Sequence, residues 1–362
     1  MAEASEDRQK KFSGTQAVRE AHRFDVARLE RYLADRIKGF QAPLEVRQFK
    51  GGQSNPTYQL VTPNRKYVLR RKPPGKLLPS AHAVDREYRI ISALHPTGFP
   101  VARPWLLCED ESVIGTIFYV MDYVEGRIYW GPLLPDQSPA QRTAIYDAMN
   151  ETFARLHNLD WQALGLQDFG KPGNYVARQI ARWGKQYKAS ETDRIDEMEK
   201  LIAWLPQHLP QNPRDSIVHG DYRLDNMILH PTEPRVIAVL DWELSTIGDP
   251  MADFTYHLMQ WQMPGEGTNT GSLLGADLAA LGIPSMDDYT AMYLSRTHRD
   301  AVPDLNYYAA YNFFRIAAIL QGIIGRIRDG TAASANAAEN ISRVRPLAER
   351  AWHFAKAAGA PG

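Results

Sequence analysis

The chain has 362 residues and carries 42 Lys and Arg against 42 Asp and Glu, so its formal net charge is zero. A neutral chain of this length has no global field that would recruit nucleic acid or an anionic membrane, and it is long enough for two folded lobes. The only cysteine, Cys108, cannot form an internal disulfide and suits a reducing cytosol. The polar N-terminus lacks the apolar core of a signal peptide, and no run of about 18 apolar residues occurs, so we expect a cytoplasmic protein without a membrane span.

The N-terminal third of the sequence predicts a helix followed by a small β-rich lobe. Apolar residues recur at helical spacing between Phe24 and Ile37, with Asp25 as a candidate N-cap. Patterns typical of strands follow at 44–49, 58–61 and 66–71, and two further runs at 113–118 and 119–124 complete a predicted five-stranded sheet. A helix is predicted over 81–94.

A polar, glycine-containing turn joins the first two predicted strands at 50–56. Gly51 and Gly52 have no Cβ, so backbone N–H groups in this turn can approach phosphate oxygens closely. An ordinary hairpin turn is the alternative. Taken with the acidic centre described below, the turn predicts a nucleotide loop, whose contacts would be Gly51, Gly52, Gln53 and Ser54.

The third predicted strand ends on two successive arginines, Arg70 and Arg71, and alternation lets only one of them face a ligand cleft. We choose Arg70 as a phosphate-binding residue, because its planar guanidinium can bind two oxygens. Glu87, on the following helix, is its candidate ion-pair partner. The alternatives are that both arginines lie on an edge strand and that Glu87 faces solvent.

The chain leaves the small sheet after residue 122. At this point backbone groups of Asp122 and Val124 are predicted, from their position alone, to contact an adenine ring. We therefore divide the chain into an N-terminal nucleotide-binding lobe, residues 1–122, and a C-terminal catalytic and acceptor-binding lobe, residues 123–362.

The C-terminal part is predicted to be mainly helical, with long helices over 139–157 and 306–328 and an Ala-rich helical end over 331–357. A further helix carries a basic stripe without an intervening acidic residue, formed by Arg178, Arg182, Lys185 and Lys188. Such a stripe is either a solvated face or a surface for an anionic partner.

The most informative stretch, residues 217–243, contains His219, Asp221, Asn226 and Asp241. Short β-like runs at 216–218, 227–229 and 236–240 place these side chains on a strand–loop–strand unit. An Asp followed five residues later by an Asn, and then an Asp that closes an apolar strand, is the spacing of a phosphoryl-transfer centre. The alternative is a set of polar loop residues between hairpin strands.

The chemistry of phosphoryl transfer explains these residue types. Asp221 would accept the proton of the attacking hydroxyl, while Asn226 and Asp241 would supply hard oxygen ligands to Mg²⁺ on the nucleotide phosphates. We expect His219 to brace the loop by hydrogen bonds. Only a short segment follows Asp241 before the helix start at Asp249-Pro250, and glycine stands at 220 where protein kinases carry the Arg of H-R-D; both features favour a small-molecule acceptor.

At these residues the chain resembles the aminoglycoside phosphotransferase family, the small-molecule relatives of protein kinases. The matching segments are His219-Gly-Asp221 through Asn226, Val239-Leu-Asp-Trp-Glu243, Gly248-Asp-Pro250 and Leu156-His157. The resemblance implies a bilobal, protein-kinase-like α+β fold with a small antiparallel β lobe and a larger, mainly helical lobe. It also implies that the enzyme uses ATP and Mg²⁺.

Within that family the chain is similar to the branch fused to certain acyl-CoA dehydrogenases, as shown by the segments 51–56, 67–73, 172–175 and 186–192. Members of that branch are linked to the phosphorylation of hydroxyacyl-CoA thioesters, which implies a CoA thioester as acceptor. An aminoglycoside or another amino alcohol is the alternative acceptor, and an inactive nucleotide- or CoA-binding module is the alternative from another class. Trp242-Glu243 replaces the Phe-Gly of kinases, and a metal contact by Glu243 stays open.

Overall fold

The computed structural model describes residues 13–50, 55–73, 82–211, 214–264, 271–328 and 337–362, without the side chains of 337–341. The chain folds into two compact units. The first unit consists of residues 1–131 and 223–245, and the second of residues 132–222 and 246–362. These units are defined by packing alone, so the functional boundary at residue 122 stays a prediction.

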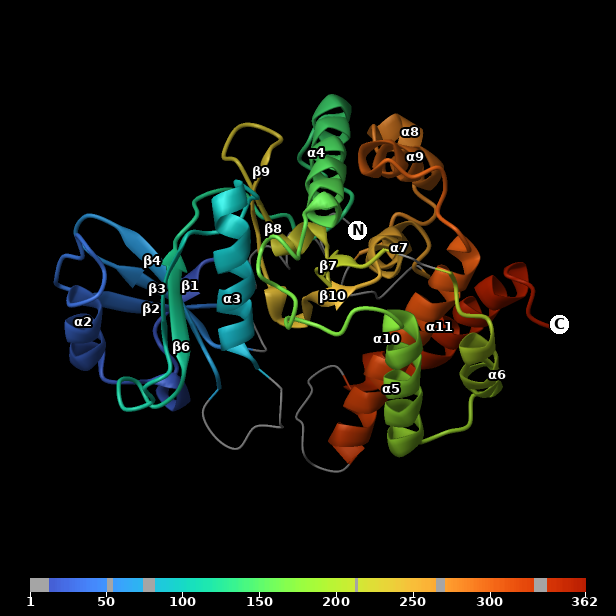
Figure 1. Cartoon of the computed structure of the whole chain (residues 1–362), viewed down its shortest axis with the longest axis horizontal. Coiled ribbons are helices and arrows are strands. Elements are labelled where there is room, and N and C mark those ends of the chain that lie inside the picture. The colour runs from blue at the N-terminus through green and yellow to red at the C-terminus, as the bar shows by residue number, and fades with distance from the viewer. Residues whose placement is uncertain (1–12, 51–54, 74–81, 212–213, 265–270, 329–336) are drawn as a thin grey trace. The chain divides into compact units, whose positions relative to one another are not determined.

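The first unit is built on an antiparallel sheet with the strand order β1-β2-β3-β4-β6-β5 (Figure 1). Its strands are β1 (Thr15–Gln16), β2 (Glu45–Phe49), β3 (Thr57–Val61), β4 (Lys66–Arg71), β5 (Pro104–Cys108) and β6 (Phe118–Asp122). The strands predicted at 44–49, 58–61, 66–71 and 119–124 are thereby confirmed, with small shifts at their ends.

The strand predicted over 113–118 is wrong, because residues 111–116 form turns and bends around Gly115, whose φ is +85°. The strand that pairs with β6 is β5 instead. It begins at Pro104, and a proline is tolerated at the first residue of an edge strand because its missing N–H is not needed there. The very short β1 adds a sixth strand that the sequence did not indicate.

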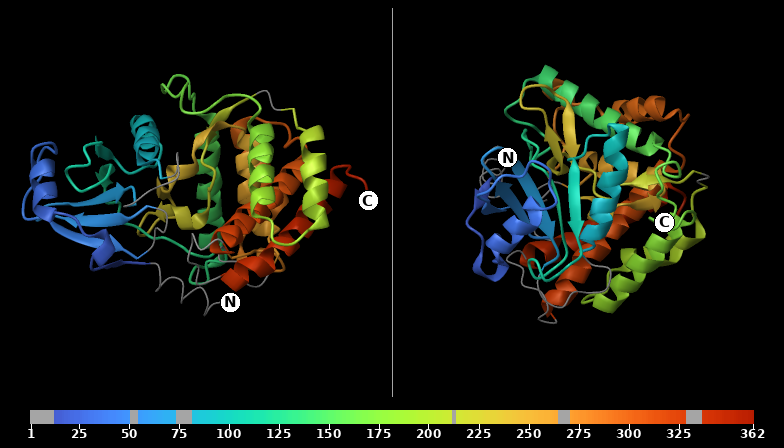
Figure 2. Two further views of the ribbon diagram at one scale, coloured as in Figure 1. Left: turned by 90° about the horizontal axis from the view of Figure 1, so that it is seen from below. Right: turned by 60° about the vertical axis from the view of Figure 1, so that its left-hand side comes forward.

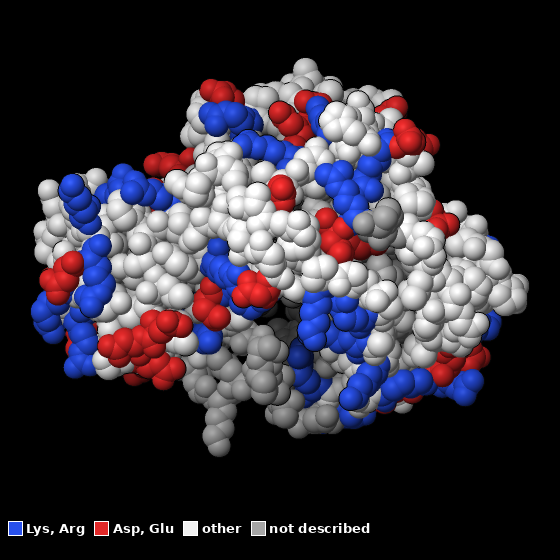
Figure 3. Space-filling view, viewed as in Figure 1, with Lys and Arg blue, Asp and Glu red and all other residues white. Residues whose placement is uncertain are grey.

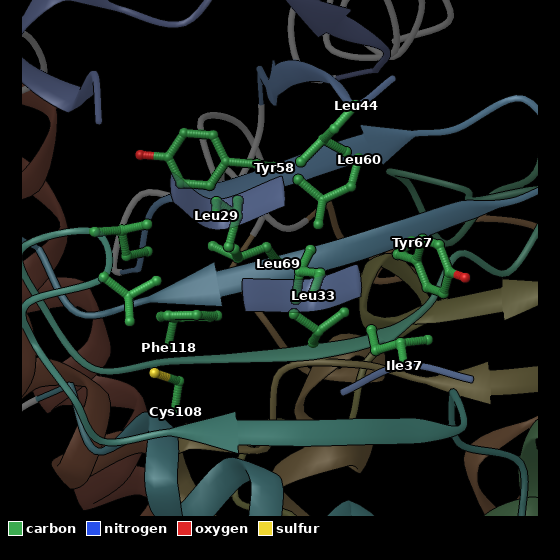
Figure 4. Packing of buried hydrophobic residues seen from close by; sticks show 13 residues of the cluster. Leu29, Leu33, Ile37, Leu44, Tyr58, Leu60, Tyr67, Leu69, Cys108 and Phe118 are labelled. Atoms are coloured by element: carbon green, nitrogen blue, oxygen red, sulfur yellow. The ribbon is translucent and has the colours of Figure 1, made fainter. Parts of the chain in front are cut away.

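One hydrophobic cluster joins α2 (Val26–Ala34) to the sheet (Figure 4). Asp25 caps the helix by accepting the N–H of Arg28 at 2.9 Å, as predicted. Leu29 and Leu33 of the helix are fully buried in the cluster together with Leu69 of β4. Alternation along β4 places Leu69 on this side and Arg70 on the other, so the core itself determines which arginine faces away from it.

Further elements complete the first unit. Helix α3 (Val84–Leu94) packs against β5, β6 and the short 3-10 helix η5 (Trp242–Leu244). Strands β8 (Met227–Leu229) and β9 (Val236–Val239) form a separate antiparallel pair, which confirms the two β-like runs predicted there. The remaining 3-10 helices of this unit are η1 (Glu20–His22), η2 (His95–Thr97) and η4 (Leu224–Asn226).

The second unit is mainly helical. Its helices are α4 (Pro139–Asn158), α5 (Tyr175–Ser190), α6 (Asp196–Trp204), α7 (Pro250–Leu258), α8 (Leu278–Leu281), α9 (Met286–Thr297), α10 (Leu305–Arg328) and α11 (Ala337–Ala357), with the 3-10 turns η3 (Leu205–Gln207) and η6 (Met259–Trp261). Helix α10 packs against α5, α7 and α11, and the helices predicted at 139–157 and 306–328 are confirmed (Figure 2). Two strands, β7 (Ser216–Val218) and β10 (Thr246–Gly248), form a small antiparallel pair. In the part of the chain that the structure describes, no helix is both long and apolar enough to cross a membrane.

Candidate active site

The loop that carries His219 and Asp221 belongs to the second unit and leaves the end of β7. Its backbone is fixed by Asp253 of α7, whose carboxylate accepts the N–H groups of His219 at 2.6 Å and of Gly220 at 2.9 Å. Gly220 has a φ of +86°, in the left-handed region that a residue with a Cβ enters only at a cost. The glycine that departs from the H-R-D pattern is therefore required by the shape of this loop.

Asp253 is buried and receives a third contact from His157 of α4. Nε2 of His157 lies 3.3 Å from the Asp253 carboxylate, and Nδ1 lies 2.6 Å from the hydroxyl of Tyr293. Burial lowers the pKa of His157, so the neutral ring donates from Nε2 and accepts from Tyr293. Burial alone would raise the pKa of Asp253, but the hydrogen bond with His157 and the backbone N–H of Gly220 outweigh burial and lower it. Asp253 is thus an ionised anchor for the loop.

The carboxylate of Asp221 contacts a tyrosine of the same unit. The hydroxyl of Tyr256 on α7 donates to Oδ1 at 2.7 Å, and the N–H of Asp221 donates to Nδ1 of His219 at 3.2 Å. His219 is fully buried, so its ring contributes to the shape of the loop. This is the bracing contact expected of His219; the part of Asp221 in proton transfer stays a prediction.

In the first unit, Arg70 lies between three carboxylates. Its Nε is 2.8 Å from Oε2 of Glu87, and its Nη2 is 2.7 Å from Oδ1 of Asp241 and 3.8 Å from Oε2 of Glu243. The predicted pair of Arg70 and Glu87 is therefore present. One guanidinium shared by three acids leaves the cluster with an excess of negative charge, which favours a further cation.

Both oxygens of the buried Glu87 carboxylate accept hydrogen bonds. Asn55 donates from Nδ2 to Oε1 at 2.9 Å, and Tyr119 donates from its hydroxyl to Oε2 at 3.1 Å. Burial raises the pKa of Glu87, Arg70 lowers it, and the negative charge of Asp241 raises it again, so that this pKa stands at about 7. Glu87 is therefore closer to neutral than an ordinary carboxyl group, and its charge depends on the other charges in the cluster.

Asn226 and Asp241 lie side by side at the open end of the β8–β9 hairpin. The strands pair through Met227 opposite Val239, and the carbonyl of Asn226 accepts the N–H of Leu240 at 2.8 Å. Asp241 itself has φ 63° and ψ 63°, a left-handed conformation that costs a residue with a Cβ roughly 1–2 kcal/mol. Backbone strain of this kind gathers at functional sites, and here the carboxylate meets Arg70 of β4.

The donor set of this hairpin end fits magnesium. A carboxamide oxygen from Asn226 and a carboxylate oxygen from Asp241 are the hard ligands that Mg²⁺ prefers, and Mg²⁺ that binds with nucleotide phosphates needs only one or two protein carboxylates. Among the described residues, no group of three or more His, Cys, Asp or Glu side chains is arranged to hold a metal alone. The hairpin end therefore suits a cation whose remaining ligands are the phosphates of a bound nucleotide.

The remaining predicted nucleotide contacts are placed only in part. Gly51, Gly52, Gln53 and Ser54 lie outside the described residues. Asp122 uses its N–H to donate to the carbonyl of Arg103 at 2.9 Å, and its carboxylate accepts the indole N–H of Trp105 at 2.7 Å. Of the backbone groups of Asp122 predicted to contact an adenine, the N–H is thus used within the sheet and the carbonyl is the remaining candidate. Val124 follows β6 and is half-buried, and its contact with a base stays a prediction.

Sequence reasoning missed residues that build these arrangements, among them Asn55, Asp253 and Tyr256. Asn55 is fully buried and also donates to Glu243 at 3.5 Å; the polar turn at 50–56 was its only signal. Asp253 follows the Gly248-Asp-Pro250 segment on the same helix, so the helix start was visible but its anchoring carboxylate was not. Tyr256 had no signal, because a contact between residues 35 positions apart depends on the tertiary fold.

The basic stripe on α5 is partly used by the chain itself. Arg178 donates to the carbonyls of Gly173 and Lys171, and Lys188 contacts Glu191 at 3.4 Å as well as Glu199. Arg182 and Lys185 are exposed. Basic side chains gather on the face of the molecule that carries α5 (Figure 3).

Comparisons with known proteins show the family of the chain. Residues 45–294 match the family described as the phosphotransferase enzyme family. Acyl-CoA dehydrogenase family member 10 of Mus musculus is 46% identical over 346 residues, which make up 95% of this chain and 32% of that protein. The chain spans less than half the length of the curated relatives it matches.

Solved structures agree with the predicted fold. A crystal structure from Ralstonia eutropha JMP134, described as a candidate aminoglycoside phosphotransferase, is 54% identical with a TM-score of 0.85, over 92% of this chain and 99% of that chain. Aminoglycoside phosphotransferase APH(4)-Ia, in a ternary complex with ADP and hygromycin B, is 14% identical with a TM-score of 0.59, over 92% of this chain and 99% of that chain. The second likeness bears on the fold alone. The predicted α+β, protein-kinase-like fold, with a small antiparallel β part and a larger helical part, is confirmed.

Proposed function

Because this chain belongs to the phosphotransferase enzyme family and is a small-molecule phosphotransferase, we propose that it transfers the γ-phosphoryl group of ATP to a small-molecule hydroxyl with the help of Mg²⁺. The observation that carries the proposal is the pairing of Asn226 and Asp241 at one hairpin end, with Arg70 on the Asp241 carboxylate. A cation and two hard oxygen ligands in one cluster are what a metal–triphosphate group needs. A cytoplasmic location, where ATP is available and the buried Cys108 stays reduced, is part of the proposal.

In the proposed reaction, Asp221 takes the proton of the acceptor hydroxyl. The hydroxyl oxygen forms a bond to the γ-phosphorus while the bond from that phosphorus to the bridging oxygen breaks, and ADP leaves with the electron pair. Asn226 and Asp241 would hold the metal, which neutralises charge on the phosphates. Arg70 would bind phosphate oxygens, with Glu87 and Asn55 fixing its position. Catalysis then consists of positioning and charge neutralisation.

We propose a hydroxyacyl-CoA as the acceptor. A relative that covers 95% of the chain is named an acyl-CoA dehydrogenase, and the α5 face presents Arg182 and Lys185 to solvent. CoA carries a pyrophosphate and a further phosphate, which such cations attract. An aminoglycoside is itself a polycation and would be repelled by this face. It is the alternative acceptor, because a structural neighbour was solved with hygromycin B.

An acceptor screen tests the proposal. The purified protein would be incubated with Mg²⁺ and ATP together with, in turn, a 4-hydroxyacyl-CoA, the free 4-hydroxy acid, a kanamycin-type aminoglycoside and choline. We expect ADP formation and a phosphorylated thioester by mass spectrometry with the CoA compound, and we expect EDTA to abolish both. ATP binding without turnover on any acceptor would instead identify a binding module. Turnover of the amines alone would overturn the acceptor assignment but not the kinase assignment.

A further inference from the structure

Tyr256 makes a side-chain contact that orients Asp221. It lies on α7, one turn beyond the loop anchor Asp253, and its hydroxyl is 2.7 Å from Oδ1 of Asp221. An ionised carboxylate only accepts hydrogen bonds, so the phenol is the donor. Charge-assisted bonds of this type are shorter and stronger than neutral ones. One oxygen of the carboxylate is thereby fixed, and with it the rotation of the group about its own axis.

Arg315 of α10 supports both the tyrosine and the loop. Its side chain is buried, its Nη2 donates to the carbonyl of Gly220 at 3.1 Å, and its guanidinium carbon lies 5.1 Å from the centre of the Tyr256 ring. Burial by itself lowers the pKa of Arg315, but neighbouring phenols and Asp221 raise it above its ordinary value. Arg315 therefore stays a buried cation next to the loop that carries Asp221.

The loop has no cation of its own at the position before Asp221, because Gly220 is required there by its positive φ. Arg315 reaches the same peptide from a helix 95 residues further along the chain. Among the described residues of the second unit, the charged and titratable groups around this loop include Tyr256 and Asp253 on α7, Arg315 and Tyr311 on α10, Tyr175 on α5, His157 on α4, and His219 and Tyr222 within the loop.

We propose that Tyr256 and Arg315 are positioning residues of the proton-accepting carboxylate. Tyr256 holds Oδ1 of Asp221 and so fixes the direction from which the carboxylate meets the acceptor hydroxyl. Arg315 contacts both the Gly220 carbonyl and the Tyr256 ring, and so fixes the position of the loop relative to the tyrosine. This inference rests on the proposed function, because it assigns Asp221 to proton transfer, but the contact itself is a property of the second unit alone.

The test compares two tyrosine-to-phenylalanine variants of the full chain. Tyr256→Phe removes the hydroxyl that donates to Asp221 and keeps the aromatic ring beside Arg315. Tyr146→Phe removes an equally short 2.7 Å hydrogen bond, from a buried tyrosine of the same unit to the carbonyl of Pro132. With a 4-hydroxyacyl-CoA, we expect Tyr256→Phe to lower kcat about ten- to a hundredfold and to leave the KM for ATP unchanged. Tyr146→Phe is expected to lower the melting temperature without a selective loss of kcat.

The pH profile separates positioning from general destabilisation. A phenol that donates to a carboxylate favours the ionised form, so its removal should move the acid limb of the kcat profile to higher pH. Tyr146→Phe should leave that limb in place. At Arg315, we expect the charge-preserving Arg315→Lys to retain a higher kcat than Arg315→Met. The comparison is made at a temperature equally far below the melting temperature of each variant.

A thermal measurement tests the contact without turnover. The difference in melting temperature between wild type and Tyr256→Phe should shrink as the pH falls through the range in which carboxylates are protonated, because the bond to ionised Asp221 is then lost in both proteins. In the background of Asp221→Asn that pH dependence should vanish. If wild type phosphorylates no acceptor while these thermal results hold, the proposed function fails and the contact stands. Equal loss of kcat in both phenylalanine variants, or a thermal difference that ignores pH, would overturn the positioning role.

Discussion

Asp221 and Asp241 are two aspartates with opposite surroundings. Asp221 sits on a loop whose backbone N–H groups are bound to Asp253, and its carboxylate is held by a phenol. Asp241 closes a strand in a strained backbone and meets a guanidinium. A proton acceptor needs a neutral donor that fixes its direction, whereas a metal ligand needs a charge partner that can be exchanged for a cation.

Replacing the proposed proton acceptor should separate chemistry from binding. In Asp221→Asn, we expect kcat to fall by about two to four orders of magnitude, because general-base catalysis is lost. The dissociation constant of Mg·ATP should change little, since Asp221 acts on the acceptor hydroxyl. Steady-state kinetics and calorimetric titration measure the two quantities, with Asp241→Asn as the matched control that weakens metal-dependent nucleotide binding. Wild-type turnover in Asp221→Asn would remove this residue as the base.

The two neighbouring arginines of β4 should respond differently to truncation. Arg70 faces the acidic cluster, so Arg70→Ala should raise the KM for ATP about tenfold or more through loss of a charged contact. Arg71 is buried on the core side, where it donates to the carbonyls of His22 at 2.9 Å and Ile114 at 3.3 Å. Arg71→Ala should therefore lower the melting temperature and change the KM for ATP far less. A larger effect of Arg71→Ala on that KM would contradict the assignment.

At the scale of elements, α3 carries a carboxyl group whose charge couples folding to pH. The pKa of Glu87 is raised from 4.5 to about 7, chiefly by burial. At low pH Glu87 is protonated in both the folded and the unfolded chain, and the folded protein is then at its most stable with respect to this group. As the pH rises towards about 7, the unfolded chain releases the proton first, so the free energy of unfolding falls.

The corresponding prediction concerns the difference in stability between wild type and Glu87→Gln, in which the glutamine mimics the neutral acid. Thermal unfolding across pH 5 to 8 should show wild type losing stability relative to the variant as the pH rises, mainly between about 5 and 7. Parallel curves for the two proteins would mean that Glu87 is ionised throughout this range and that Arg70 outweighs burial.

The elements that the sequence could predict are those with a strong local pattern. Strand β4 alternates clearly, α2 has both its apolar spacing and its Asp25 cap, and the hairpin carrying Asn226 and Asp241 is marked by its apolar strands. Strand β5 was missed because it begins at Pro104, and proline is not a residue that indicates a strand. Only its pairing with β6 defines it. Local pattern carries no information on which distant segment will complete a ladder.

The same limit applies to the candidate site. The residues that we propose to perform chemistry, Asp221, Asn226 and Asp241, stand at a characteristic spacing, so the sequence alone could single them out. The residues that hold them in place have no characteristic spacing. Arg315 contacts Gly220 across 95 positions of the sequence, and Asn55 contacts Glu243 across 188. Such contacts depend on the folded chain, and a single sequence does not encode them as a motif.

At the scale of the whole molecule, the α5 face tests the acceptor. Arg178 and Lys188 are occupied by contacts within the chain, so the informative pair is Arg182 and Lys185. Replacing both by Gln should raise the KM for a hydroxyacyl-CoA several-fold, because exposed charges contribute modestly, and should leave the KM for ATP unchanged. Added salt should weaken acceptor binding to wild type more than to the variant, since ions screen exposed charges.

The control for that prediction removes charges elsewhere on the surface. Arg47→Gln with Arg235→Gln neutralises two exposed side chains of the first unit that pair with nearby glutamates. This variant should behave like wild type towards both substrates. If the α5 variant binds the CoA thioester as well as wild type does at low salt, the stripe is only a solvated face.

The β8–β9 hairpin belongs to the first unit although the chain on either side of it belongs to the second. This has a consequence for how the protein can be recombined with its relatives. A hybrid gene joined only at residue 131 would combine the sheet and Arg70 of one parent with Asn226 and Asp241 of the other. The acidic cluster and its arginine come from the same parent only if two segments, 1–131 and 223–245, are exchanged together. Functional chimeras should therefore be recovered with paired crossovers and seldom with a single one.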